Sequence, residues 1–243
     1  MLSSGWHVWP ERRIVVLTKV PAPGTTKTRL GRTIGGVAAA TAARAFLEDT
    51  LALAARAARV VDAALVVHTD PDAPGAEFMD LLRAHGASQA PQGPGGLGPR
   101  LRRALEAAPD AARVVLGSDA PDLPTEHVVA AFAGLLRAPV VLGPTTAADG
   151  GYHLLALAPG VSTAWLGAPI RWSTAHTLED TARAALTAGL ASRNGPAWSD
   201  VDDAAGLAAL GARLALEPDA RVAPRTRAWL AAGADPPRSE SSR

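Results

Sequence analysis

Short apolar runs recur along the chain, and each is bounded by polar or turn-forming residues. They cover residues 14–18 (IVVLT), 63–69 (AALVVHT), 113–116 (RVVL), 139–143 (PVVLG) and 151–157 (GYHLLAL). Uninterrupted apolar runs of this length are typical of β-strands that are buried on both faces of a sheet. Residues 88–89 fit a short edge strand.

The segments between these runs favour helices. Residues 36–59 are rich in alanine, the residue with the highest helix propensity. Further helices are expected at residues 76–85, 99–108, 125–137, 173–188, 203–216 and 225–232. Thr125, Ser173 and Asp203 stand where an N-cap residue is expected. Residues 92–98 (QGPGGLG) predict a loop.

Strands and helices alternate through at least residue 143, which predicts βαβ units and a mainly parallel sheet with right-handed crossovers. The predicted fold class is therefore α/β. In such sheets ligands bind beyond the carboxyl ends of the strands. Three segments, at residues 19–30, 117–124 and 144–153, follow predicted strands, and the chemistry is expected there.

The first of these segments reads KVPAPGTTKTRL and carries three cations, Lys19, Lys27 and Arg29. Phosphate groups need positive charge and directed N–H donors, and arginine adds a bidentate fork. Gly24 lets the backbone approach a ligand closely. The segment therefore predicts a phosphate-binding loop, and the alternative is a solvated surface loop with chance cations. The run GTTKT is not a P-loop, because neither glycine of that pattern is in place.

The second segment reads GSDAPDLP. Asp119 comes directly after a buried strand, where a carboxylate is well placed to hold Mg²⁺ together with water and phosphate oxygens. Asp122 is either a further metal ligand or a turn residue. A later cluster, SDVDD, offers Asp202 as a second metal contact. Asp200 and Asp202 would face opposite sides of an extended stretch, so at most one of them would point into a given cleft.

The third segment contains Asp149, Gly150 and Gly151, which predict a flexible turn into a strand. Two glycines would let the backbone approach a substrate closely, and the alternative is a tight hairpin turn. Gly96 lies in the glycine-rich loop, which either covers a base or sugar or is simply mobile. Ser173 either contacts a ligand or caps a helix.

Composition narrows the class of protein. The 243 residues predict a single domain at residues 13–216, with an N-terminal extension at 1–12 and a C-terminal helix and flexible tail at 217–243. The net charge of +1 gives no reason to expect a nucleic acid or a membrane as partner. The absence of cysteine excludes disulfides and thiolate metal sites. No apolar run has signal-peptide or membrane-spanning length, so a cytoplasmic protein is expected.

Several motifs together resemble a known family. They are K-x-P-x-P-G-x-x-K-T-R-L at residues 19–30, G-S-D-x-P-D-L at 117–123, D-G-G-Y at 149–152, W-S-T at 172–174 and D-V-D at 200–202. In this order they make residues 13–210 similar to the DUF2064 family, which is glycosyltransferase-like and belongs to the nucleotide-diphospho-sugar transferase superfamily. The resemblance implies the GT-A fold, a Rossmann-like three-layer α/β/α arrangement. The K-T-R-L piece also resembles 2-phospho-L-lactate guanylyltransferase.

The resemblance implies roles for particular residues. Lys19, Lys27 and Arg29 would contact a nucleoside triphosphate or an acceptor phosphate during catalysis, and Asp119 would bind Mg²⁺ or Mn²⁺. The candidates for nucleotide or substrate binding are Pro23, Gly24, Thr28, Gly96, Asp149, Gly150, Gly151 and Ser173. The family pattern D-x-D-T-P-E-D-L is kept only in part, because Gly206 stands where its later acidic residue is expected.

Three functions fit these motifs. A nucleotidyltransferase would let an acceptor phosphate attack the α-phosphorus of an NTP and release pyrophosphate. A GT-A glycosyltransferase would use a nucleotide-sugar, and it usually presents D-x-D where this chain has Ser118, Asp119 and Ala120. A non-catalytic nucleotide-binding module is the third. The lone carboxylate and the cationic loop favour the first, whose partners would be a nucleotide and a small-molecule acceptor. A homodimer is also considered.

Overall fold

The structure, a computed structural model, describes residue 9 and residues 11–146 and 150–233. Within these residues one seven-stranded sheet has the order β3-β2-β1-β4-β6-β5-β7. The strands are β1 (Arg12–Lys19), β2 (Ala64–Asp70), β3 (Ser88–Pro91), β4 (Ala112–Gly117), β5 (Val140–Pro144), β6 (Tyr152–Leu157) and β7 (Ser192–Asn194).

The sheet is parallel except at β6, which pairs antiparallel with both β4 and β5. In the parallel part, Lys19 of β1 lies opposite Asp70 of β2, and Leu17 lies opposite Gly117 of β4. The carboxyl ends of these three strands therefore meet at one edge of the sheet, together with the first residue of the antiparallel β6. The prediction of a mainly parallel α/β sheet is confirmed.

Helices cover both faces of the sheet. They are α1 (Thr28–Ile34), α2 (Gly36–Val61), α3 (Ala76–Ala84), α4 (Leu97–Glu106), α5 (Thr125–Leu135), η2 (Ala164–Gly167), α6 (Thr177–Thr187), α7 (Ala204–Leu216) and α8 (Pro224–Ala231). Buried side chains of α2, α3 and α5 pack on one face, and those of α4, η2 and α6 pack on the other. The result is the expected three-layer α/β/α arrangement.

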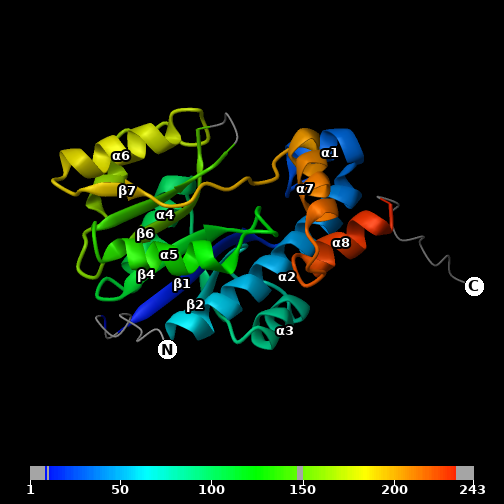
Figure 1. Ribbon diagram of the computed structural model, residues 1–243, viewed down its shortest axis with the longest axis horizontal. Helices are drawn as coiled ribbons and strands as arrows, with labels where there is room; N and C mark the ends of the chain where they lie inside the picture. The colour runs from blue at the N-terminus through cyan, green and yellow to red at the C-terminus, as the bar shows by residue number, and fades with distance from the viewer. Residues whose placement is uncertain (1–8, 10, 147–149, 234–243) are drawn as a thin grey trace, which may run out of the picture.

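A third apolar cluster joins α1, α7 and α8 to the first half of α2. Figure 1 shows these helices together at the end of α2 that points away from the labelled strands. Phe46 of α2 meets Trp229 of α8 edge to face, with ring centroids 6.4 Å apart. Asp49 of α2 accepts the backbone N–H groups of Arg225 and Thr226 at 3.1 and 2.8 Å, so it caps the start of α8. Helix α8 thus packs on the helices beside the sheet.

The length of α2 follows from its composition. Alanine costs no side-chain entropy in a helix and is small enough to pack close to a neighbouring element. Most of its alanines are buried between the sheet and the third cluster. The helix ends where Asp62 adopts the left-handed conformation, with φ 52°. Across the described residues, no helix combines the length and the apolar character that a membrane span requires.

Four details of the predicted helices and loops were wrong. Thr125 is the first residue of α5 and makes no cap bond, because Pro124 with its fixed φ takes the N-cap position. Ser173 caps no helix, since α6 begins at Thr177 and its N-cap residue is His176. Residues 28–30 of the expected loop form the first turn of α1, and α4 begins at Leu97, inside the expected glycine-rich loop.

Candidate functional site

A cavity of about 730 Å³ opens at the edge of the sheet where β1 and β4 end and β6 begins. The rule for ligand sites in open α/β sheets places them at this edge. Residues from all three of the predicted segments reach it, and so do residues that precede α7. The residues predicted from the sequence that line it are Lys19, Lys27, Thr28, Arg29, Gly96, Asp119, Ser173 and Asp202.

Lys27 is the centre of the charged cluster in this cavity. Its Nζ lies 2.6 Å from Asp119 Oδ1 and 3.4 Å from Asp202 Oδ1, and it donates to the carbonyl oxygen of Val201 at 2.6 Å. The Lys27 side chain is 6% exposed, whereas those of Asp119 and Asp202 are 42% and 46% exposed. The ammonium group is therefore buried beneath two carboxylates that remain open to the cavity.

The backbone explains how Lys27 reaches these partners. The loop before it is closed by Thr26, whose hydroxyl group donates to Ala22 O at 3.0 Å and lies 3.2 Å from the Ala22 amide nitrogen, which donates to it. Lys27 then adopts a left-handed conformation, φ 48° and ψ 45°, at the N-cap of α1. Non-glycine residues in this region are strained and often occur at functional sites. Here the conformation turns the side chain toward the end of β4.

Asp200 and Asp202 both line the cavity, contrary to the prediction that they face opposite sides. The prediction assumed strand alternation, but residues 199–202 belong to no strand. Val201 between them is fully buried in the third cluster, and its N–H donates to Asp119 O at 2.9 Å. This backbone bond holds the segment against the end of β4 and brings both carboxylates to the same cavity.

Lys19 and Arg29 remain accessible to a ligand. Lys19 is exposed at the end of β1, and within the described part of the chain it has no salt bridge. The Arg29 side chain is 61% exposed, and its nearest carboxylate oxygen, on Asp202, lies 3.8 Å away. Such a weak exposed pair leaves the guanidinium group able to bind an anion. These two cations border the cavity on the side of the loop before α1.

Arg100 of α4 lines the same cavity, and sequence reasoning missed it. Its Nη1 lies 2.6 Å from Asp70 Oδ2 and 3.0 Å from Gln92 Oε1, and its Nε donates to Gly95 O at 2.8 Å. Arg103 donates to the carbonyl groups of Gln92 and Pro94. Two arginines thus brace the glycine-rich loop. The available signal was that both arginines lie in the first two turns of the helix that follows the glycines.

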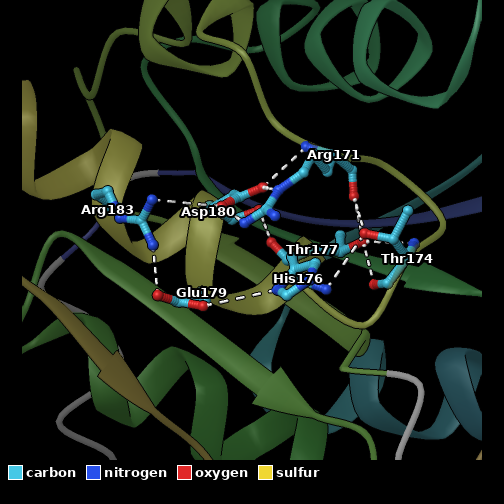
Figure 2. A network of polar contacts seen from close by, with 8 residues as sticks. Arg171, Thr174, His176, Thr177, Glu179, Asp180 and Arg183 are labelled. Carbon is cyan, nitrogen blue, oxygen red and sulfur yellow. Dashed lines mark hydrogen bonds and ion pairs between the residues drawn. The ribbon is translucent and has the colours of Figure 1, made fainter.

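Ser173 lines the cavity in a left-handed conformation, φ 59°. Figure 2 shows the network that fixes its segment, in which Arg171 reaches Asp180 of α6. The Arg171 guanidinium donates to Asp180 at 2.7 and 2.9 Å, and the Arg171 backbone N–H donates at 3.0 Å. The guanidinium beside it holds the pKa of Asp180 well below its ordinary value. Thr174 and Thr177 both donate to Arg171 O.

The structure requires glycine at position 150, but not for the close approach to a substrate that was predicted. A Cβ at this position would lie 1.9 Å from Ala175 O, and φ is +63°. The Gly150 carbonyl oxygen accepts from the N–H of Leu178, in the first turn of α6. The close backbone approach is therefore to the segment before α6, and Gly150 and Gly151 are absent from the cavity wall. Asp149 lies outside the described residues.

We expect Gly150→Ala to destabilise the fold by about 2–4 kcal/mol, because it adds both a left-handed strain and a clash with backbone. Chemical denaturation measures this change. Gly160→Ala is the matched control, since Gly160 has φ +72° but no atom within 4 Å of its Cβ position. That control should cost about 1 kcal/mol. Equal costs for the two variants would contradict the packing argument.

Pro23 and Gly24 also lie off the cavity wall. Both are exposed, and Gly24 has φ +77°. A Cβ on Gly36 would come within 3.3 Å of Gly24 N, so the loop packs closely against the start of α2. These two residues shape the turn that presents Lys27.

Asp122 does not reach the cavity. Its side chain is 3% exposed and pairs with Arg213 of α7, at 2.8 Å from Oδ2 to Nε and 3.2 Å from Oδ1 to Nη2. Trp198 Nε1 donates to the same carboxylate at 3.1 Å. Asp122 therefore fastens α7 and the segment of Trp198 to the loop after β4, away from the carboxylates that are open to the cavity.

His153 of β6 forms part of the cavity wall and is 8% exposed. Its Nδ1 lies 3.2 Å from Pro144 O, which fixes the proton on Nδ1 when the ring is neutral. Burial lowers the pKa of His153 from 6.5 to about 4. The ring is therefore neutral at physiological pH and contributes no charge to the site.

This lowered pKa predicts a pH dependence of stability. Below pH 6.5 the unfolded chain takes up a proton that folded His153 does not, so the stabilisation present above pH 6.5 is lost as the pH falls toward 4. The loss should reach about 2 kcal/mol at pH 5. Urea unfolding at pH 7 and pH 5 measures it. His153→Gln should reduce the dependence, and His68, His85 and His127, whose pKa values burial also lowers, should account for what remains. His176→Gln, at an exposed histidine, should not reduce it; identical slopes for both variants would refute the assignment.

The donor set of the cavity fits a divalent cation of the Mg²⁺ or Mn²⁺ type. Asp119 and Asp202 converge on a single positive group, the Lys27 ammonium, and both carboxylates are open to the cavity. Two carboxylates with water and substrate phosphates are the usual ligands of Mg²⁺. No group of three or more metal-ligating side chains occurs among the residues that the structure describes.

Comparison with known proteins identifies one family and several solved structures with a similar fold. The family profile described as "Uncharacterized protein conserved in bacteria (DUF2064)" matches residues 50–174. This span includes Asp119 and Ser173, whereas the cationic loop precedes it and Asp202 follows it. No curated protein matches the sequence.

Three solved structures show the fold. A Desulfovibrio desulfuricans G20 protein, provisionally described as a nucleotide-diphospho-sugar transferase, has a TM-score of 0.76 at 28% identity, covering 91% of this chain and 94% of that one. A 4-diphosphocytidyl-2C-methyl-D-erythritol synthase from Anaerococcus prevotii DSM 20548 has a TM-score of 0.55 at 12% identity, with 84% and 99% covered. A CMP:2-keto-3-deoxy-manno-octonic acid synthetase complexed with CTP has a TM-score of 0.51 at 15% identity, with 85% and 99% covered.

The two distant structures share only the fold with this chain, whereas the Desulfovibrio protein is similar in sequence as well. All three structures confirm the GT-A-like architecture, and the likeness to the Desulfovibrio protein, at 28% identity, classes the chain as a transferase. The profile match covers just over half of the chain and includes the carboxylate after β4 and the segment of Ser173. This chain belongs to the DUF2064 family.

Proposed function

We propose that this chain is a nucleotidyltransferase that joins an NTP to a phosphorylated small-molecule acceptor. The observation that carries the proposal is the gathering of Lys19, Lys27 and Arg29 with Asp119 and Asp202 around one cavity at the carboxyl edge of the sheet. A triphosphate needs several positive groups and a divalent cation in one place, and this cavity supplies both the cations and the carboxylates.

The reaction is a displacement at phosphorus. An oxygen of the acceptor phosphate forms a bond to the α-phosphorus, the bond from the α-phosphorus to the bridging oxygen breaks, and pyrophosphate leaves with the electron pair. The attacking phosphate is already an anion, so no general base is required. Positioning and neutralisation of charge then account for most of the catalysis.

Each charged residue has a role in this scheme. Lys19 and Arg29 bind and neutralise the triphosphate, and Lys27 connects the phosphate side of the cavity to its carboxylates. Asp119 and Asp202 would hold Mg²⁺ or Mn²⁺, which supplies further positive charge to phosphate oxygens when bound. Ser173, whose neighbours Arg171 and Thr174 belong to the hydrogen-bond network, lies at the cavity wall and orients the substrate or acceptor.

A glycosyltransferase is the second candidate, and the description of the Desulfovibrio relative as a nucleotide-diphospho-sugar transferase favours it. In that case an acceptor hydroxyl would attack the anomeric carbon of a nucleotide-sugar, and a nucleoside diphosphate would leave. Against it, Gly117 and Pro121 stand two residues before and after Asp119, so no D-x-D pair is present there, and the second carboxylate comes from a distant segment.

Product analysis separates the candidates. The purified protein with Mg²⁺ is offered each NTP, and separately each common nucleotide-sugar, with a panel of phosphorylated and hydroxylated small acceptors. Pyrophosphate from an NTP supports nucleotidyl transfer, and a nucleoside diphosphate from a nucleotide-sugar supports glycosyl transfer. Nucleotide binding that persists in EDTA, without turnover of any nucleotide, would leave a binding module as the function.

A further inference from the structure

The Lys27 ammonium has no donor left for a phosphate group. It carries three N–H donors, and it contacts three acceptors: Asp119 Oδ1 at 2.6 Å, Val201 O at 2.6 Å and Asp202 Oδ1 at 3.4 Å. A phosphate can therefore gain a hydrogen bond from Lys27 only when Lys27 loses its contact with one of these acceptors.

The same ammonium stands where a divalent cation would be attracted. A positive ion that binds Asp119 and Asp202 must either displace Lys27 from them or lie beside it. Two positive charges a few ångströms apart in a partly buried site repel strongly. Lys27, with its side chain 6% exposed, cannot reduce this repulsion by moving into water without leaving its three partners.

We propose that Lys27 is a built-in counter-cation that occupies the two carboxylates until a divalent cation and a phosphate ligand arrive together. The divalent cation takes over Asp119 and Asp202, and Lys27 turns its freed N–H donors to the phosphate. Each ligand then favours binding of the other, because the coupling of two binding events is reciprocal. This inference rests on the proposed function only in that the second ligand is taken to be a phosphate group.

The strained backbone supports such a device. Lys27 is left-handed at φ 48°, and the three contacts of its ammonium help to hold it there. When the carboxylates are taken by another cation, two of these contacts are lost and the conformation loses support. A residue held in a strained state by its ligands is a suitable element to change position on binding.

The first part of the proposal is that Lys27 hinders binding of a divalent cation. Binding of Mn²⁺ in the absence of phosphate, measured by the electron paramagnetic resonance signal of free Mn²⁺, tests this part. The wild-type protein should bind Mn²⁺ weakly without a phosphate ligand. Lys27→Met keeps the length of the side chain but removes its charge, so Mn²⁺ affinity should rise at least tenfold. Lys27→Arg keeps a charge and should stay within threefold of the wild type. Circular dichroism verifies that each variant is folded.

Two controls locate the effect. Lys19→Met removes the only other lysine of the chain, which is exposed and not paired with these carboxylates, and it should change Mn²⁺ affinity less than threefold. Adding Asp119→Asn to Lys27→Met should abolish the gain. Mn²⁺ affinity that is equal in the wild type and Lys27→Met, or a gain that survives Asp119→Asn, would overturn the inference.

The second part of the proposal is that Lys27 binds phosphate once the divalent cation is bound. Calorimetric titration with inorganic pyrophosphate in saturating Mg²⁺ tests this part. Lys27→Met should weaken pyrophosphate binding at least tenfold, so one substitution tightens the cation and loosens the phosphate. A purely structural role of Lys27 would weaken both ligands, and that result would contradict the coupling. The Mn²⁺ measurement needs no substrate, so it stands even when product analysis refutes the proposed function.

Discussion

Asp119→Asn should reduce turnover by about 10³-fold or more, because the variant loses the charge that holds a divalent cation beside the transferred phosphoryl group. The side chain is 42% exposed, and asparagine has nearly the same shape and keeps an oxygen acceptor for the buried Lys27 ammonium, so the thermal midpoint should change little. Initial rates measured over a range of Mg²⁺ concentrations separate the loss of cation affinity from the loss of turnover at saturation.

Asp203→Asn provides the control for this variant. Asp203 is the N-cap of α7, where its side chain accepts from the N–H of Gly206 at 2.9 Å, and asparagine caps a helix equally well. This variant removes a carboxylate adjacent to Asp202 without touching the cavity wall. Full activity of Asp119→Asn, or an equal loss in Asp203→Asn, would show that the site has been assigned to the wrong carboxylates.

Asp122→Ala should destabilise the fold by about 3–5 kcal/mol, because it leaves the partly buried Arg213 guanidinium without its counter-charge. Trp198 also loses the acceptor for its indole N–H. Urea unfolding measures the change in free energy. Mn²⁺ binding to the folded fraction should be nearly unaltered, since Asp122 does not line the cavity.

An exposed pair of the same chemistry is the matched control. Asp219 and Arg221 form a bidentate salt bridge at 2.9 Å, with the Arg221 side chain 90% exposed. Asp219→Ala should therefore leave stability almost unchanged, because water replaces the lost partner. Comparable destabilisation by the two variants would mean that burial is not what gives the Asp122 pair its strength.

A comparison of Asp119 with Asp122 shows what the sequence could not decide. Asp119 and Asp122 belong to one short motif, and both follow the same strand. One is open to the cavity and the other is sealed beneath α7, because Arg213, 91 residues later, reaches only the second. A partner so distant in the chain leaves no local signal.

The fold itself was largely predictable. Apolar runs and alanine-rich segments depend on local composition, so the strands β1, β2, β4, β5 and β6 and most helices were found near their true bounds. The ligand edge followed from strand direction alone, and Lys19, Arg29 and Asp119, which were chosen by that rule, line one cavity.

Side-chain direction outside regular elements was not predictable. The alternation rule failed at Asp200 and Asp202 because their segment is not a strand. Gly150 was read as a substrate contact, although the backbone of Ala175 is what excludes a larger residue. Such packing depends on a neighbour whose position only the tertiary structure gives.

The contacts that Val201 makes with the site are both made by its backbone, through its N–H to Asp119 and its carbonyl oxygen to Lys27. Every amino acid except proline offers these two groups, so other substitutions at this position leave the hydrogen bonds possible. An inserted or deleted residue between 198 and 203 would instead shift the register by about 3.4 Å and move both groups away. Among related chains, therefore, the spacing of this segment should vary less than its residues.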